Sequence, residues 1–301
     1  MTGDAFPATA LLSKHWITAI RPPTLSAAIV PVLVGTAAAV SIEDSFRVAV
    51  FIATLAAAIL IQIGTNFAND IFDFEQGADT EDRLGPPRVT QSGLISPQRV
   101  RLGTGVAFGG AAAIGIYLIF VGGWPILVIG ALSIIAGIAY TGGPWPLGYH
   151  GLGDVAVFLF FGLVAVIGTY YLQADSVSGI AVVAAVPVGL LVTAILVVNN
   201  LRDLETDLKA GKRTLAVRIG EQATRLQYVA LVIGPYLLMP VLWAMDTAPW
   251  VFLTYLSLPI ALALVRAILS GTSGRSLNDV LKRTALLHFA FGALLALGLL
   301  L

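Results

Sequence analysis

The sequence contains no cysteine, so disulfide bonds, thiolate metal sites and cysteine nucleophiles are all excluded. Its three histidines, His15, His150 and His288, lie far apart in the chain and form no zinc-binding pattern. Charge is also scarce: only 11% of the residues are Asp, Glu, Lys or Arg, whereas a soluble domain carries about 25%. This shortage of charge excludes an ordinary soluble fold.

Apolar residues take up the remaining sequence and make 57% of the 301 positions. A membrane-spanning helix needs about 20 mostly apolar residues. The sequence predicts an all-α polytopic membrane protein with nine transmembrane helices, formed as a single domain over residues 1–301. No cleavable signal peptide is expected, because the first 20 residues hold no continuous apolar core. The predicted spans are 24–41, 48–68, 100–121, 124–140, 152–172, 180–199, 226–245, 249–269 and 284–301.

The basic residues predict the orientation of these spans. If the N-terminus is cytoplasmic, 16 of the 17 Lys and Arg residues fall on the cytoplasmic side, and only Arg47 falls outside. The two long connections, 69–99 and 200–225, lie on the same side. We therefore expect a cytoplasmic N-terminus, a cytoplasmic functional site and an external C-terminus.

A stripe of amide and carboxylate side chains ends the second predicted span. Asn66, Asn69, Asp70 and Asp73 follow the spacing i, i+3, i+4, i+7, so they share one face if the helix continues this far. Carboxylates at the end of a membrane helix are costly to desolvate and need a partner. Ordinary solvated loop charges are the alternative interpretation.

A second acidic segment follows the sixth predicted span. Asp203 and Asp207 stand one helical turn apart, and Asn199 lies one turn earlier on the same face. Oxygen-only ligands favour a hard cation such as Mg²⁺ or Mn²⁺, and Mg²⁺ commonly takes waters and substrate phosphate oxygens as its other ligands. The two segments together predict one site that binds a diphosphate through divalent cations.

Basic residues lie beside both acidic segments. Arg83 and Arg88 follow the first, and Lys212 and Arg213 follow the second. Cations at these positions could neutralise a departing diphosphate. The positive-inside rule alone would also place basic residues here.

Three other positions on the cytoplasmic side stay open. Tyr140 closes the fourth predicted span; it either lines a cavity or is an interfacial aromatic, and its position alone favours the second. Asp154 begins the fifth span, where it either orients a substrate or caps a helix. Arg21 precedes the first span and is expected to anchor it at the interface.

These motifs together resemble the UbiA-type intramembrane aromatic prenyltransferases. Within that superfamily the chain is most similar to the 1,4-dihydroxy-2-naphthoate prenyltransferases. The resemblance runs almost from end to end. It is carried by the segments 21–25, 69–73, 82–91, 140–144, 199–203 and 210–218.

One position departs from the general family pattern Asn-x₃-Asp-x₃-Asp. Asn69 and Asp73 match its first two positions, but residue 77 is Gly. The naphthoate branch commonly combines this Gly with an Asp two residues later, which Asp79 supplies.

The resemblance implies a nine-helix bundle around a central cavity and a set of site residues. The implied ligands of Mg²⁺, or of Mn²⁺, are Asn69, Asp70, Asp73, Asp79, Asp203 and Asp207. The implied catalytic residues are Asp70, Asp73, Asp203, Asp207 and Tyr140. The implied substrate-binding residues are Asn66, Asn69, Arg83, Arg88, Thr141, Asp154, Asn199, Arg202, Lys212 and Arg213.

The implied reaction ionises an allylic prenyl diphosphate and transfers its chain to 1,4-dihydroxy-2-naphthoate, with loss of the carboxylate. The prenyl tail is expected to lie in the apolar bundle, open to membrane lipid. A bacterial inner membrane is the expected location, and no nucleic-acid partner is expected; the sequence carries no signal for the oligomeric state. The alternatives are another acceptor, such as 4-hydroxybenzoate or homogentisate, and a cation-coupled transporter.

Overall fold

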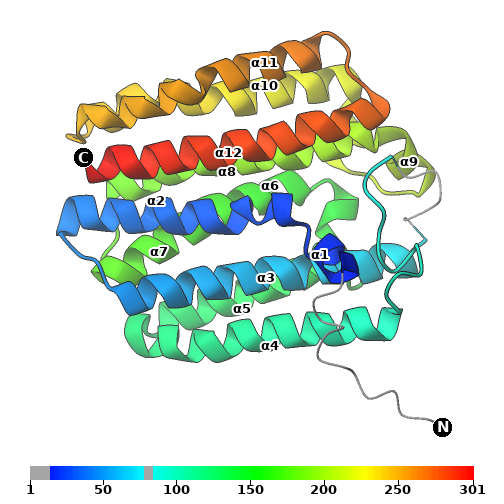
Figure 1. Cartoon of the computed structure of the whole chain (residues 1–301), viewed down its shortest axis with the longest axis horizontal. Coiled ribbons are helices and arrows are strands. Elements are labelled where there is room, and N and C mark those ends of the chain that lie inside the picture. The colour runs from blue at the N-terminus through cyan, green and yellow to red at the C-terminus, as the bar shows by residue number, and fades with distance from the viewer. Residues whose placement is uncertain (1–13, 78–83) are drawn as a thin grey trace.

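The computed structural model describes residues 14–77 and 84–301, which form helices, turns and irregular connections without any strand. Eight helical segments have the length and composition to cross a membrane, and α5 is a shorter apolar helix of 16 residues. They lie side by side in one bundle (Figure 1). The segments are α2 (Ser26–Glu43), α3 (Val48–Glu75), α4 (Pro97–Gly122), α5 (Trp124–Ala139), α6–η4–α7 (Gly153–Ala174), α8 (Gly179–Arg202), α10 (Leu215–Ala244), η5–α11 (Pro249–Leu269) and α12 (Leu277–Leu300).

Each predicted span corresponds to one of these segments, so the all-α membrane fold is confirmed. Three helices extend well beyond their predicted bounds, and one of them, α12, begins at Leu277 instead of 284. α3 continues to Glu75, which keeps the whole polar stripe helical. α10 begins at Leu215, before the predicted start at 226, and its backbone breaks at Gly220, where φ is 81°. A glycine adopts this φ without the steric cost that a side chain adds.

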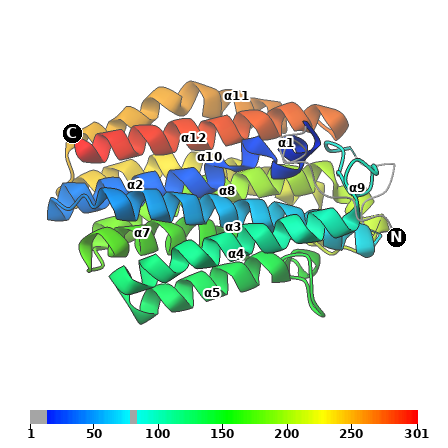
Figure 2. The same cartoon turned by 60° about the horizontal axis from the view of Figure 1, so that its bottom comes forward.

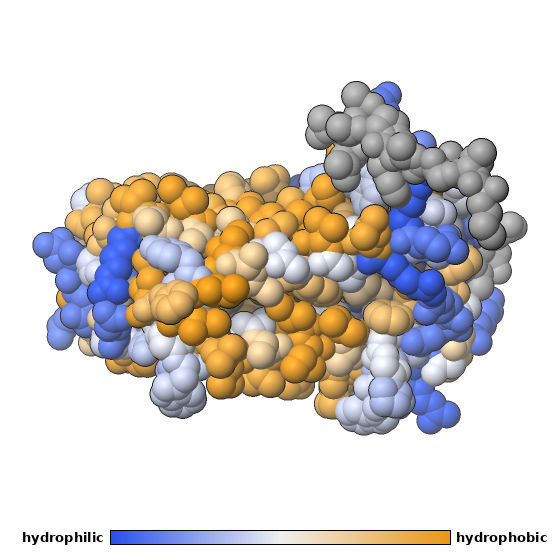
Figure 3. Space-filling view, turned by 90° about the horizontal axis from the view of Figure 1, so that it is seen from below, coloured by the Kyte–Doolittle hydropathy of each residue, from blue (hydrophilic) through white to orange (hydrophobic). Residues whose placement is uncertain are grey.

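The polar parts of the molecule gather at the ends of the bundle. The short helices α1 (Lys14–Ile20) and α9 (Leu204–Lys209) lie at one end, and the C-terminus lies at the other (Figures 1 and 2). Hydrophobic side chains cover the middle of the surface, with hydrophilic ones toward both ends (Figure 3). This is the surface expected of a chain that spans a bilayer.

Small residues bring two helices into backbone contact near the middle of the bundle. The segment η4 (Phe158–Val164) is a π-helical stretch between α6 (Gly153–Val157) and α7 (Ala165–Ala174). Its Gly162 faces Gly189 of α8, and a Cβ added at Gly162 would lie 2.6 Å from the Gly189 Cα. Close approach at small residues is a common way for membrane helices to associate.

The contact predicts that Gly162→Ala destabilises the protein. The new methyl group would meet backbone atoms that cannot move aside, at a cost of about 1–3 kcal/mol. Thermal unfolding in detergent should show a lower Tm. Gly105→Ala on α4 is the matched control, because an added Cβ there meets nothing within 4 Å. Equal Tm values for the two variants would contradict the tight packing.

Candidate functional site

The polar stripe of α3 lies inside the protein rather than in solvent. Asp70 and Asp73 each expose only 2% of their surface. A buried carboxylate needs hydrogen bonds or an opposite charge to offset its lost hydration. The structure supplies both from segments far away in the sequence, so the stripe determines where those segments lie.

Asp73 is the point at which the two acidic segments meet. Its carboxylate accepts hydrogen bonds from Arg88 at 3.0 Å and from the Tyr149 hydroxyl at 2.8 Å. The Lys212 ammonium lies 4.0 Å from Asp73 and 3.8 Å from Asp207. Carboxylates from α3 and α9 therefore share one cationic position.

Asp70 has a different environment, although it is one helical turn from Asn66 on the same stripe. Its two oxygens accept the backbone N–H groups of Val89 at 3.2 Å and Thr90 at 2.9 Å. The Arg21 guanidinium lies 3.9 Å away. Asp70 thus fixes the connection formed by residues 84–96 against α3.

Arg202 holds the same connection from the opposite side. Its guanidinium donates to Asp203 through Nε at 2.8 Å and to Asn199 at 2.8 Å. It also donates to the Asn278 side-chain oxygen at 2.8 Å, while the Asn278 amide donates to the Leu84 carbonyl at 2.9 Å. The end of α8 and the start of α12 are therefore linked to the 84–96 connection.

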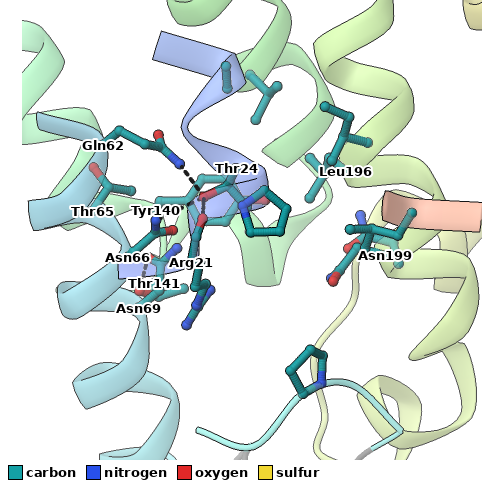
Figure 4. A pocket seen from close by; sticks show the side chains of 18 of the residues that line it. Arg21, Thr24, Gln62, Thr65, Asn66, Asn69, Tyr140, Thr141, Leu196 and Asn199 are labelled. Atoms are coloured by element: carbon teal, nitrogen blue, oxygen red, sulfur yellow. Dashed lines mark hydrogen bonds between the residues drawn. The ribbon is translucent and has the colours of Figure 1, made fainter. Parts of the chain in front are cut away.

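The remaining amides of the stripe order the two flanks of the site. Asn66 donates to the Ile20 carbonyl at 2.9 Å and to the Thr24 hydroxyl at 3.0 Å. The Thr141 hydroxyl donates to the Asn69 side-chain oxygen at 2.8 Å. Figure 4 shows these side chains from α3 facing the segment that carries Thr24.

These residues surround a cavity of about 360 Å³, which we call the main cavity. A smaller, mostly apolar cavity of about 110 Å³, the side cavity, shares Tyr140, Val157 and Phe161 with it. A polar end beside Asp73 thus continues into apolar space between the helices. The central cavity implied by the family resemblance is present.

The structure places nine of the predicted site residues in the wall of the main cavity: Asn66, Asn69, Asp73, Arg88, Tyr140, Thr141, Asn199, Arg202 and Lys212. Asp207 and Asp203 contact that wall through Lys212 and Arg202. Asp70, Asp154 and Arg213 also lie outside the wall. Asp79 and Arg83 lie outside the described residues, so their roles stay predictions.

Tyr140 and Asp154 lie next to one another beside the main cavity. Burial raises the pKa of the Tyr140 phenol, and the charge of Asp154 raises it further, so the phenol is neutral. Asp154 accepts a hydrogen bond from Gln227 of α10 at 2.6 Å, while its other oxygen is buried without a hydrogen bond. Its carboxylate therefore joins α6 to α10.

The oxygen donors fit a hard cation. Within the described parts of the chain, no three His, Asp or Glu side chains gather in a metal-binding cluster. Asp73 and Asp207 nevertheless face one cationic position, and Mg²⁺ commonly uses one or two carboxylates together with waters and phosphate oxygens. The donor set suits a cation that arrives with a phosphorylated ligand.

Sequence reasoning missed Tyr149 and Asn278 in this arrangement, and it gave Arg21 only the role of an interface anchor. Tyr149 lies in the connection after α5, Asn278 at the start of α12, and Arg21 before α2. Tyr149 and Asn278 carry no motif of their own, although both fall on the side that holds the acidic segments. That shared side was the only signal that could have singled them out.

The hydrogen bonds of Asp70 predict that Asp70→Asn loosens the 84–96 connection. An amide offers one acceptor oxygen in place of two, so the bonds to Val89 and Thr90 are weakened by about 1–3 kcal/mol. Hydrogen exchange of peptides covering 84–96 should speed up about tenfold. Glu75→Gln is the control, since Glu75 pairs with Arg101 and not with this connection. Unchanged exchange in Asp70→Asn would refute the role.

Known proteins are similar in sequence to this chain over nearly its whole length. A 1,4-dihydroxy-2-naphthoate octaprenyltransferase of Mycobacterium tuberculosis is 40% identical over 272 residues, which cover 90% of this chain and 92% of the relative. The enzyme of the same name from Escherichia coli is 35% identical, covering 90% of each chain. A 2-carboxy-1,4-naphthoquinone phytyltransferase of Synechocystis is 31% identical, covering 95% of this chain and 92% of the relative.

Solved structures share the fold. A UbiA homologue from Archaeoglobus fulgidus, bound to GPP and Mg²⁺, has a TM-score of 0.64 at 16% identity, covering 94% of this chain and 99% of the other. An apo homologue from Aeropyrum pernix has a TM-score of 0.68 at 16% identity, covering 94% and 98%. Residues 28–291 match the UbiA prenyltransferase family, and this chain belongs to that family.

Proposed function

We propose that this protein transfers a prenyl chain from an allylic prenyl diphosphate to 1,4-dihydroxy-2-naphthoate, with loss of the carboxylate and release of diphosphate. One observation carries the proposal. Asp73 and Asp207 meet around Lys212 at the polar end of a cavity that continues into apolar space. The naphthoate prenyltransferases among its relatives support this choice of acceptor.

Asp73 and Asp207 are the proposed centre of the metal site, with Asn69, Asp203 and Asp79 as further ligands. Mg²⁺, or Mn²⁺, bound here with the diphosphate would stabilise the negative charge that develops on the leaving group. Asp70 is better placed to act through the 84–96 connection, because both of its oxygens accept backbone N–H groups.

The cations of the cavity wall would assist the departure of diphosphate. Arg88 and Lys212 already lie beside Asp73, within 3.0 and 4.0 Å of its carboxylate. Positive side chains fixed in a cavity stabilise developing charge without having to reorganise. The Arg88 and Lys212 side chains would therefore both be within reach of phosphate oxygens bound beside Asp73.

The apolar part of the site suits the prenyl chain. Phe160 and Phe161 of η4 line the side cavity, and Tyr140 lies where it joins the main cavity. A neutral phenol with its ring beside the allylic carbon would stabilise positive charge there. The 84–96 connection borders the polar end and would limit the access of water to the cation.

The proposed location is the bacterial inner membrane, with the site at the cytoplasmic end of the bundle. That end carries α1 and α9, together with the connection 84–96 (Figure 1). The diphosphate then enters from the cytoplasm, while the tail lies among the helices in contact with lipid.

The test is turnover by purified protein in detergent or lipid with Mg²⁺ and a long prenyl diphosphate. We expect a decarboxylated prenyl naphthoquinol from 1,4-dihydroxy-2-naphthoate and no product from 4-hydroxybenzoate, as read by mass spectrometry. Product from 4-hydroxybenzoate alone would support prenyl transfer but would refute 1,4-dihydroxy-2-naphthoate as the acceptor. A transporter would consume no prenyl diphosphate.

The site predicts that Asp73→Asn and Asp207→Asn each reduce kcat by at least about 100-fold. Each change removes a charge that the metal-bound diphosphate requires, a loss of about 3 kcal/mol or more at the transition state. Asp175→Asn, at the end of α7 where Asp175 pairs with Arg47, is the matched control and should keep wild-type kcat. Near-normal kcat in either site variant would refute the shared site.

The metal requirement predicts complete loss of turnover in EDTA and recovery when Mg²⁺ is added back in excess. The carboxylates cannot by themselves neutralise a diphosphate. Mn²⁺ should also restore activity, because the ligand types do not separate the two ions. Turnover that continues unchanged in chelator would rule out a metal-bound diphosphate.

A further inference from the structure

Tyr149 contacts both halves of the site with one side chain. It lies in the short helix η3 (Leu147–His150), within the connection between α5 and α6. Its hydroxyl donates to Asp73 Oδ1 at 2.8 Å. The Lys212 ammonium lies over its ring, 5.0 Å from the ring centroid. Tyr149 therefore joins a carboxylate of α3 to a cation of the segment that follows α9.

The hydroxyl contact helps to fix the orientation of the Asp73 carboxylate. Tyr149 donates to Oδ1, and Arg88 donates to Oδ2 at 3.0 Å. A hydrogen bond on each oxygen opposes rotation of the carboxylate plane. Because an ionised carboxylate has about four lone-pair positions, these two bonds leave a position on each oxygen for a cation. Asp73 is thus held in one orientation and can still bind a metal ion.

The ring contact acts on Lys212. Its ammonium lies 4.0 Å from Asp73 Oδ1 and 3.8 Å from Asp207 Oδ1. The face of an aromatic ring attracts a cation placed above it, so the Tyr149 ring stabilises the ammonium in this position. The same oxygen of Asp73 that accepts from the Tyr149 hydroxyl therefore also faces the cation that the Tyr149 ring holds.

Backbone hydrogen bonds fix Tyr149 itself. Its carbonyl accepts the Arg213 N–H at 3.0 Å, and its N–H donates to the Pro146 carbonyl at 3.1 Å. The preceding residue, Gly148, donates its N–H to the Tyr140 carbonyl at 2.9 Å. A side chain supported in this way can hold the groups of a functional site in a defined geometry.

We propose that Tyr149 is a positioning residue of the metal and diphosphate site. Its hydroxyl orients Asp73 toward the metal ion, and its ring holds Lys212 toward the phosphate oxygens. This assignment rests on the proposed function. Tyr149 lies outside the wall of the main cavity, so it acts through Asp73 and Lys212 rather than by contact with the substrate.

The test measures Mn²⁺ binding to the purified full-length protein by electron paramagnetic resonance, alone and with inorganic pyrophosphate. Tyr149→Phe removes the hydroxyl and keeps the ring. It should weaken Mn²⁺ binding by about 10- to 100-fold, the range for residues that orient a metal ligand. Pyrophosphate affinity at saturating Mn²⁺, read by titration calorimetry, should stay at the wild-type value because the ring still holds Lys212.

Tyr149→Leu separates the ring from the hydroxyl. It should weaken Mn²⁺ binding as much as Tyr149→Phe does. It should also weaken pyrophosphate binding by about 2- to 30-fold, the range for cation–π contacts.

Tyr171→Phe is the matched control for the loss of a hydroxyl. The Tyr171 hydroxyl donates to the Gly122 carbonyl at 3.1 Å, and Tyr171 lies near the end of α7, at the opposite end of the bundle from α9 (Figure 1). This variant loses a hydrogen bond of comparable length and should keep both affinities.

Wild-type Mn²⁺ affinity in Tyr149→Phe would overturn the assignment. So would an equal loss of Mn²⁺ affinity in Tyr149→Phe and Tyr171→Phe, which would indicate general loosening of the bundle. If the wild-type protein bound no Mn²⁺ in either condition, the proposed metal site would be refuted, and this role with it. Mn²⁺ binding without turnover of 1,4-dihydroxy-2-naphthoate would count against the proposed acceptor alone, and the Mn²⁺ comparison would still decide the role of Tyr149.

Discussion

The buried carboxylates of α3 are the constraint on which the site depends. Asp70 and Asp73 are almost fully enclosed at the end of a membrane helix, where an uncompensated charge is costly. The structure compensates Asp70 with backbone N–H groups and Asp73 with Arg88, Tyr149 and Lys212. These partners come from three connections: 84–96, the one after α5 and the one after α9, so one helical stripe brings the polar end of the bundle together.

The 84–96 connection shows how this organisation serves the site. Asp70 holds its middle, and Asn278, supported by Arg202, holds its start. Residues from this connection line the main cavity. Fixing it from both sides would limit the access of water to the proposed allylic cation. The hydrogen bonds that compensate the buried charges of Asp70 and Arg202 are therefore the same ones that hold this connection over the cavity.

The cavities divide the proposed substrates by polarity along the bundle. Charged groups meet at the end that carries α9, while the side cavity is lined mainly by small and apolar side chains such as Ala58, Ala136 and Phe160. A prenyl diphosphate has the same division, with a charged head and an apolar tail. The bundle can therefore orient it without a separate binding domain.

The sequence by itself determined the membrane fold, the helix positions and the residues of the two acidic segments, because apolar length and helical spacing are local properties. The continuous stripe from Asn66 to Asp73 was predictable for the same reason. Only the tertiary structure decided which side chains meet. Asp70 accepts backbone N–H groups, whereas Asp73 lies in the cavity wall and accepts from Tyr149. Asn278 donates to the Leu84 carbonyl, a contact that no motif predicted. Pairing between distant segments depends on packing in three dimensions, which spacing along one helix does not encode.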